Sequence, residues 1–162
     1  MIHSTSAEPV VGVGAVVFDS EGRVLLVRRG RPPKLGSWSL PGGRLEPGET
    51  LVSGCRREVR EETGLDISPG PIVAVADRAS EGFHYIIVDF LADLARLGSS
   101  EPLPDTDVSD ARWVRLDELP GYDLVEGVAA VIAAARHSRE LGTGLAALAD
   151  DYRLFLPLRS GR

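Results

Sequence analysis

The chain has 162 residues, of which 43% are apolar, and this is the size and composition of one compact domain with an ordinary core. Its formal net charge of −6 disfavours binding to long nucleic acid, because that affinity depends on neutralising phosphates with Lys and Arg. The longest apolar run, residues 128–135, is far shorter than the roughly 20 residues that cross a bilayer, which argues against a membrane segment. The first residues lack a secretory signal pattern, and the single cysteine, Cys55, cannot form an internal disulfide. We therefore expect a soluble, cytoplasmic protein.

The N-terminal part of the chain shows strand and turn patterns. After a flexible N-terminus over residues 1–9, the β-branched run at residues 10–18 predicts a strand. Turn residues at 19–22 separate it from an apolar run at 23–28, and together these predict a β-hairpin. A short strand is expected over residues 38–40, where the following Pro-Gly-Gly ends it.

A helix is expected after the Pro47-Gly48 turn. Thr50 is a typical N-cap residue, and apolar residues recur at helical spacing from Leu51 to Val59. Gly64 has the character of the left-handed residue that follows a helix. The pattern predicts a helix of about fourteen residues.

Strands and helices alternate in the rest of the chain. Two strands are expected at residues 72–76 and 83–92, on either side of a turn, and a short strand is expected at 111–114. The Ala- and Val-rich segment 124–136 predicts a second helix, and residues 141–149 predict another short one.

This order of elements favours an α/β layered domain over residues 10–137. Residues 138–162 then form a C-terminal extension with aromatic and aliphatic residues near its end, such as Tyr152 and Phe155. The extension could cover the domain itself or a dimer partner, and the sequence leaves both readings open.

Three acidic residues of the first helix share one face. Glu58, Glu61 and Glu62 stand at positions i, i+3 and i+4, and like charges at such spacing destabilise a solvated helix by roughly 0.2–0.5 kcal/mol per pair. A divalent cation would reverse the sign of that energy. Carboxylate oxygens suit Mg²⁺ or Mn²⁺, which bind one or two carboxylates together with waters and substrate phosphates.

A charged surface helix is the alternative interpretation of the same residues. Arg56, Arg57 and Arg60 lie among the acids and could offset them. However, Arg57 and Glu61 have the base N-terminal to the acid, which is the weaker i,i+4 orientation. Residue types alone leave the metal site and the ion-pair network both open.

The full spacing of residues 43–65 resembles the signature of the Nudix hydrolase superfamily, also called MutT-like. That signature reads Gly, five residues, Glu, seven residues, Arg-Glu, an aliphatic residue, any residue, Glu-Glu, any residue, Gly and an aliphatic residue. The matching positions are Gly43, Glu49, Arg57, Glu58, Val59, Glu61, Glu62, Gly64 and Leu65. From average residue usage, this agreement has a chance probability on the order of 10⁻⁹ per starting point. Neighbouring segments extend the likeness over residues 10–136.

The resemblance implies an α/β/α sandwich with a mixed β-sheet between helices. It also implies that Glu58 and Glu62 hold metal ions, with Glu61 as a further ligand or water partner. The backbone carbonyl of Gly42 is a further expected ligand, and Asp107 is the expected fourth acid. Arg57, braced against Glu49, would fix the loop to the helix, so the expected catalytic set is Glu49, Arg57, Glu58, Glu61 and Glu62.

The resemblance also places basic residues against substrate phosphates. Arg28, Arg29 and Arg44 border the expected site, and arginine can hold phosphate oxygens through two hydrogen bonds at once. The alternative is that they are solvated surface arginines. Tyr122, after a Pro-Gly turn, is a candidate for stacking on a nucleobase.

Simpler roles are expected for other residues that chemistry could use. Cys55 and Gly54 stand where small residues let the helix pack on the sheet, and a single cysteine is usually a core residue. We expect Trp38 and Trp113 to anchor the core. His84 is expected to be a paired, half-buried imidazole.

The implied reaction is metal-dependent hydrolysis of a nucleoside diphosphate linked to another group, with water attacking one phosphorus. The substrate would be a small nucleotide, either a (d)NTP or ADP-ribose or a nucleotide sugar. The proline expected after the signature in ADP-ribose enzymes is missing, since position 81 is Glu. A non-catalytic nucleotide-binding regulatory module is the alternative, and a homodimer is compatible with the resemblance.

Overall fold

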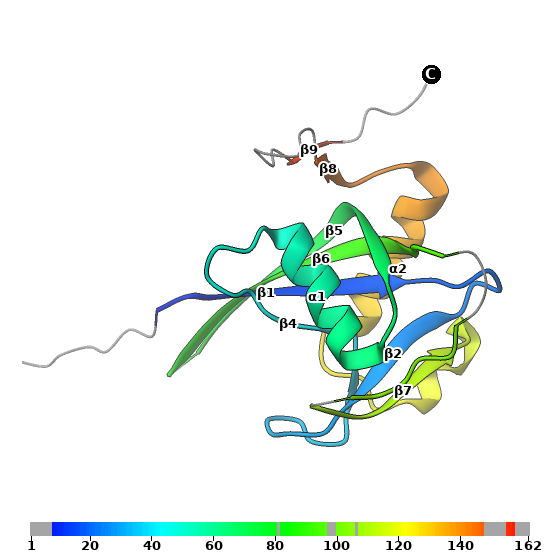
Figure 1. Cartoon of the computed structure of the whole chain (residues 1–162), viewed down its shortest axis with the longest axis horizontal. Coiled ribbons are helices and arrows are strands. Elements are labelled where there is room, and N and C mark those ends of the chain that lie inside the picture. The colour runs from blue at the N-terminus through cyan, green and yellow to red at the C-terminus, as the bar shows by residue number, and fades with distance from the viewer. Residues whose placement is uncertain (1–7, 81, 97–99, 106, 148–154, 158–162) are drawn as a thin grey trace, which may run out of the picture.

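The computed structural model describes residues 8–80, 82–96, 100–105, 107–147 and 155–157 (Figure 1). The first seven residues of the expected flexible N-terminus, and Tyr152 of the C-terminal extension, lie outside these ranges. Within them, no helix is long and apolar enough to span a membrane.

A six-stranded mixed sheet forms the centre of the molecule. Its strand order is β4 (Gly42–Arg44), β1 (Val10–Val17), β6 (Phe83–Leu94), β5 (Ile67–Ser80), β8 (Leu145–Ala147) and β9 (Phe155–Pro157). β1 runs parallel to β6 and antiparallel to β4. The predicted strands at 72–76 and 83–92 are confirmed as parts of the β5–β6 hairpin, which is longer than predicted.

A second sheet has three antiparallel strands in the order β3 (Trp38–Ser39), β2 (Val24–Arg29) and β7 (Val108–Val114). β7 includes the predicted strand at 111–114. A 3₁₀ helix, η1 (Leu116–Gly121), follows β7.

The predicted hairpin of residues 10–28 is wrong, because β1 and β2 belong to different sheets. The turn itself forms: the buried Asp19 carboxylate accepts bonds from the backbone N–H groups of Glu21 and Arg23, and Phe18 bridges Val24. Both strands are continuous apolar runs rather than alternating ones. Such strands are buried on both faces, and each gains more by entering the interior of its own sheet.

The first predicted helix is confirmed as α1 (Leu51–Thr63). Thr50 caps its N-terminus, where the side-chain oxygen accepts a bond from the Ser53 backbone N–H at 3.1 Å. Gly64 ends the helix with a left-handed φ of 71°, and its N–H donates to the Arg60 carbonyl.

The second helix, α2 (Val128–Leu141), is displaced toward the C-terminus from the predicted range 124–136. Leu124 bridges Trp38 instead, and Gly127, with a φ of 89°, precedes the helix. The apolar residues before Gly127 therefore pair with β3 rather than forming a helical turn.

The short helix predicted at 141–149 is also wrong over its described part. Two glycines with positive φ, Gly142 and Gly144, end helical structure, and β8 then pairs with the free edge of β5 through Ile72 and Leu145. An open sheet edge offers hydrogen bonds that a single helical turn cannot match. Residues 148–149 lie outside the described ranges.

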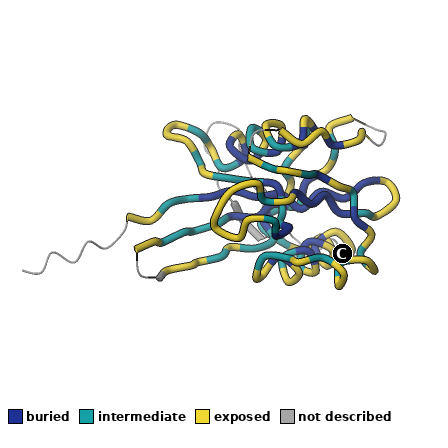
Figure 2. Tube along the Cα trace, turned by 90° about the horizontal axis from the view of Figure 1, so that it is seen from below, coloured by how far each residue is buried: buried dark blue, intermediate teal, exposed yellow. Residues whose placement is uncertain are grey.

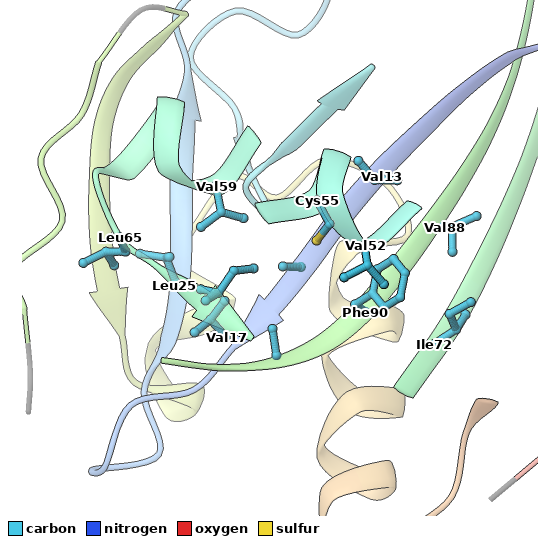
Figure 3. Packing of buried hydrophobic residues seen from close by; sticks show 13 residues of the cluster. Val13, Val17, Leu25, Val52, Cys55, Val59, Leu65, Ile72, Val88 and Phe90 are labelled. Carbon is cyan, nitrogen blue, oxygen red and sulfur yellow. The ribbon is translucent and has the colours of Figure 1, made fainter. Parts of the chain in front are cut away.

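Two apolar clusters lie on opposite faces of the sheet, one under each helix. On β1, Val13, Ala15 and Val17 face α1, whereas Val16 and Phe18 belong to the cluster that includes α2. Figure 3 shows the α1 side, where residues of the helix meet residues of β1 and β6. The buried segments lie in the middle of the molecule, and the exposed ones lie in the loops, on the helices and at the protruding strand ends (Figure 2). The predicted α/β/α sandwich with a mixed sheet is confirmed.

Candidate active site

The acidic face of α1 lies against β4, the edge strand of the large sheet. Glu58 packs directly on Gly43: a Cβ added there would overlap the Glu58 carboxylate. This side chain is 15% exposed, and burial raises its pKa, although Arg57 opposes the shift. Glycine at position 43 is therefore required for the position that the Glu58 carboxylate occupies.

Glu62, one turn further along α1, contacts the first residue of β4. Its Oε2 atom accepts a hydrogen bond from the backbone N–H of Gly42 at 3.0 Å. Burial raises the pKa of Glu62 to about 8, and the negative charges of Glu58 and Asp107 raise it further, against the hydrogen bond and the charge of Arg29. Glu62 thus lacks enough positive charge around it to stabilise its ionised form.

Arg57 connects the helix to the preceding loop. Its guanidinium binds both carboxylate oxygens of Glu49, and Nη2 also donates to the Arg44 carbonyl at 3.0 Å. This pairing lowers the pKa of Glu49 and raises the pKa of Arg57. The predicted brace between Arg57 and Glu49 is confirmed.

Arg57 also binds two of the three helix acids. Its Nη1 atom donates to Glu58 at 2.9 Å and to Glu61 at 3.0 Å, while Glu62 is bound to Gly42 instead. Accordingly, no three His, Cys, Asp or Glu side chains among the described residues are gathered as a cage for a metal ion. Arg60, another arginine among these acids, pairs with Asp66 instead, at 2.6 Å.

The residues present nevertheless fit a magnesium-type ion. Mg²⁺ retains several waters and uses one or two carboxylates together with substrate phosphates, so it does not require three protein ligands. Glu58 and Glu62 are two carboxylates whose pKa is raised because positive charge offsets their burial only in part. A bound cation would supply that missing charge.

The expected fourth acid, Asp107, directly precedes β7. Its carboxylate binds Arg31 at 2.8 Å, and its carbonyl accepts a bond from the Gly30 backbone N–H at 3.0 Å. Since its charge contributes to the raised pKa of Glu62, the structure places Asp107 near the helix acids.

The three expected phosphate-binding arginines lie around this region with different partners. Arg28 donates to the Gly36 carbonyl at 3.0 Å, and Arg29 donates to the Pro33 carbonyl at 2.7 Å. Arg44, next to Gly43, reaches the Tyr85 hydroxyl at 3.2 Å. Arg29 is the one whose charge lowers the pKa of Glu62.

Tyr122, the candidate for base stacking, packs edge to face on Trp38 with ring centroids 5.2 Å apart. Trp38 is 8% exposed and anchors the α2 cluster, as predicted. Trp113 is only partly buried, packs against the α1 cluster and donates to the Ser100 carbonyl at 3.0 Å.

Cys55 is a core residue, as predicted. It is fully buried, its Sγ donates to the Gly14 carbonyl at 3.6 Å, and burial raises its pKa to about 12. At Gly54 an added Cβ would meet Leu45 and Glu49, so this glycine lets the loop before the helix pack on it. His84 is half-buried and pairs with Asp77 at 2.7 Å, as predicted.

One acidic residue near this region was missed by the sequence analysis. Asp89, in the middle of β6, is 5% exposed, and burial raises its pKa to about 6. An acid inside the otherwise apolar run of residues 85–92 was the signal that could have found it.

Comparison with known proteins agrees with this geometry. The family model described as NUDIX domain matches residues 8–135. The chain is 34% identical over 131 residues to 8-oxo-dGDP phosphatase of Homo sapiens, covering 76% of this chain and 40% of the relative. It is 33% identical over 115 residues to ADP-ribose pyrophosphatase of Methanocaldococcus jannaschii, covering 69% and 65%. The crystal structure of the MutT NUDIX hydrolase from Burkholderia pseudomallei matches with a TM-score of 0.68 at 29% identity, covering 79% of this chain and 98% of that one. The chain thus spans less than two thirds of the length of these two curated relatives.

Proposed function

The chain belongs to the NUDIX family, and on that premise we propose that it is a metal-dependent hydrolase of a nucleoside diphosphate linked to another group. The observation that carries this proposal is the pair Glu58 and Glu62. Both carboxylates are held against the glycines of β4, and burial raises the pKa of each.

Glu58 and Glu62 are the residues that would hold Mg²⁺ or Mn²⁺, with the Gly42 carbonyl and Glu61 as further ligands. When bound, the ion would polarise phosphoryl oxygens and lower the pKa of the attacking water. Gly42 and Gly43 bring the backbone close to these carboxylates without a side chain in between.

The other residues act on substrate and solvent. One helix glutamate accepts the proton of the attacking water, since a carboxylate with a raised pKa is a competent base near neutral pH. Arg29 and Arg44 bind the phosphates, with Arg28 beside them and Asp107 as an additional acid. Arg57 is a positioning residue, because it fixes Glu49, Glu58 and Glu61 relative to one another.

The substrate class is a small nucleotide, either a (d)NTP or ADP-ribose or a nucleotide sugar. The named activities of the two curated relatives, on 8-oxo-dGDP and on ADP-ribose, support a phosphoanhydride next to a nucleoside. We assign the hydrolase to residues 10–137, in line with the family match at 8–135.

A panel of nucleotides tests the proposal. The protein is incubated with deoxynucleoside di- and triphosphates, ADP-ribose and nucleotide sugars, with Mg²⁺, with Mn²⁺ or with EDTA, and the products are separated by chromatography. We expect a nucleoside monophosphate from at least one substrate and no product in EDTA. Tight binding without turnover across the panel would favour the non-catalytic binding module instead.

A further inference from the structure

Asp89 is a buried carboxylate without a partner in the described part of the chain. It is 5% exposed, and no hydrogen bond or ion pair to it is found among those residues. Its raised pKa, near 6, has burial as its cause. An ionised carboxylate out of water and without donors is strongly unfavourable, so this position calls for a ligand that supplies them.

Toward β1 and β4, the sheet positions beside Asp89 carry no side chain. Asp89 pairs with Gly14 of β1, and Gly14 pairs in turn with Gly42 of β4, so two successive neighbours across the sheet are glycines. A Cβ at Gly14 would overlap the Asp89 carboxylate. The carboxylate therefore lies over β1, toward β4, in the space that the glycine leaves.

The space continues over Gly12, which faces the same way because it is two residues from Gly14. A Cβ built on Gly12 would come within 4 Å of two atoms only, the Gly43 carbonyl oxygen at 3.4 Å and Ile87 Cγ1 at 3.5 Å. Gly12, Gly14 and Gly42 thus form a strip of the sheet without side chains. Arg44 pairs with Gly12 and donates a hydrogen bond to the Tyr85 hydroxyl, so the side chains of Arg44 and Tyr85 border this strip.

This strip lies on the α2 face of the sheet, whereas the helix acids lie on its α1 face at the β4 edge. β4 contacts Glu58 and Glu62 through Gly43 and Gly42, while β6 carries Asp89 two strands away. Two inter-strand spacings amount to about 10 Å. Because β4 is the edge strand, a nucleotide with its phosphates at the glutamates can pass around β4 and place its base over the glycines, with one edge at Asp89.

We propose that Asp89 is the base-specificity residue of this site and accepts two hydrogen bonds from a guanine-type base. This inference rests on the proposed function. An ionised carboxylate only accepts hydrogen bonds, and its two oxygens match two adjacent donors. Guanine presents such a pair, N1–H and the 2-amino group, whereas adenine and cytosine present a donor beside an acceptor.

The test exchanges a hydrogen-bonding group on each side of the proposed contact, on residue 89 and on the base. Asp89→Asn replaces one acceptor by a donor, and xanthine replaces the 2-amino group of guanine by a carbonyl oxygen. The kcat/KM values are measured for GDP, IDP and XDP with the wild-type protein and the variant. Asp93→Asn, an exposed acid of the same strand, is the matched control.

We expect the wild type to prefer GDP over XDP by about 10- to 100-fold, with IDP in between, since each good bidentate pair discriminates by that order. Asp89→Asn should reverse the preference, so that XDP exceeds GDP, and Asp93→Asn should leave it unchanged. Loss of stability alone cannot produce a reversal.

A folded Asp89→Asn variant with the wild-type GDP to XDP ratio would overturn the proposal, and so would a wild type that hydrolyses all bases equally. If the variant does not fold, Gly14→Ala displaces the carboxylate in its place and should abolish the preference for GDP. A wild type that hydrolyses no nucleotide refutes the proposed function instead. Calorimetric binding of GDP and XDP then decides the base inference, which absence of binding would refute.

Discussion

Two positions of α1, Arg57 and Glu62, show how different the surroundings of charged groups on one helix can be. Arg57 is surrounded by acids, and its pairing with Glu49 shifts both groups toward their charged forms. Glu62, five residues later, is shifted in the opposite direction, to a pKa of about 8. The compensated group stabilises the loop, while the uncompensated one is where we propose that a cation binds. Charge compensation therefore distinguishes the scaffold residue from the residue of the proposed site.

The largest effect should come from removing the uncompensated charge. Glu62→Gln keeps the shape and the bond from Gly42 but removes the negative charge, so we expect kcat to fall by at least about 10²-fold. Circular dichroism should show an unchanged fold. The control is Glu140→Gln, which removes an exposed acid of α2. Near-normal turnover of the Glu62 variant would remove this residue from the proposed site.

The compensated position should respond mainly in stability. Arg57→Lys retains the charge but loses the two-pronged contact with Glu49, and we expect a loss of about 1–2 kcal/mol in the free energy of unfolding. Urea titration measures it, with Arg56→Lys as the control for an exposed arginine of the same helix. An equal effect of the two substitutions would show that the network around Arg57 contributes nothing specific.

A smaller effect is expected when the Glu58 carboxylate is displaced but not removed. Gly43→Ala introduces a methyl group that overlaps this carboxylate, and we expect kcat/KM to fall by about tenfold. Gly121→Ala, where an added Cβ meets no atom within 4 Å, is the control. If Gly43→Ala has full activity, the carboxylate position seen here is not the one that matters for turnover.

The mildest expected effect is on stability as a function of pH. The pKa of Glu62 rises from 4.5 to about 8 on folding, so between these values the folded state binds more protons than the unfolded state. The free energy of unfolding should therefore decrease as pH rises from about 5 to about 8 in EDTA. Thermal melts should show a flatter dependence for Glu62→Gln, and added Mg²⁺ should stabilise the wild type most at the upper end. A wild-type profile with no such decrease would contradict the assigned shift.

Local sequence determined the elements with strong end signals and the chemistry of the signature. Thr50 and Gly64 bound α1 because capping and left-handed backbone are local properties, and the spacing of the acids places them on one face of any helix. Arg57 meets Glu49 because a short loop leaves little freedom between them. The family could thus be inferred from residues 43–65 without any structure.

Tertiary structure decided what depends on partners distant in sequence. β1 and β2 look like a hairpin until their other neighbours are known, and residues 145–147 form a strand because β5 offers a free edge. Asp19 and Asp89 are both buried acids that follow apolar residues of a strand. Asp19 finds its donors within four residues, whereas the space and the missing donors around Asp89 come from glycines on two other strands. Sequence spacing determines which side chains share a face, but only the packing of the strands decides which charges are left uncompensated.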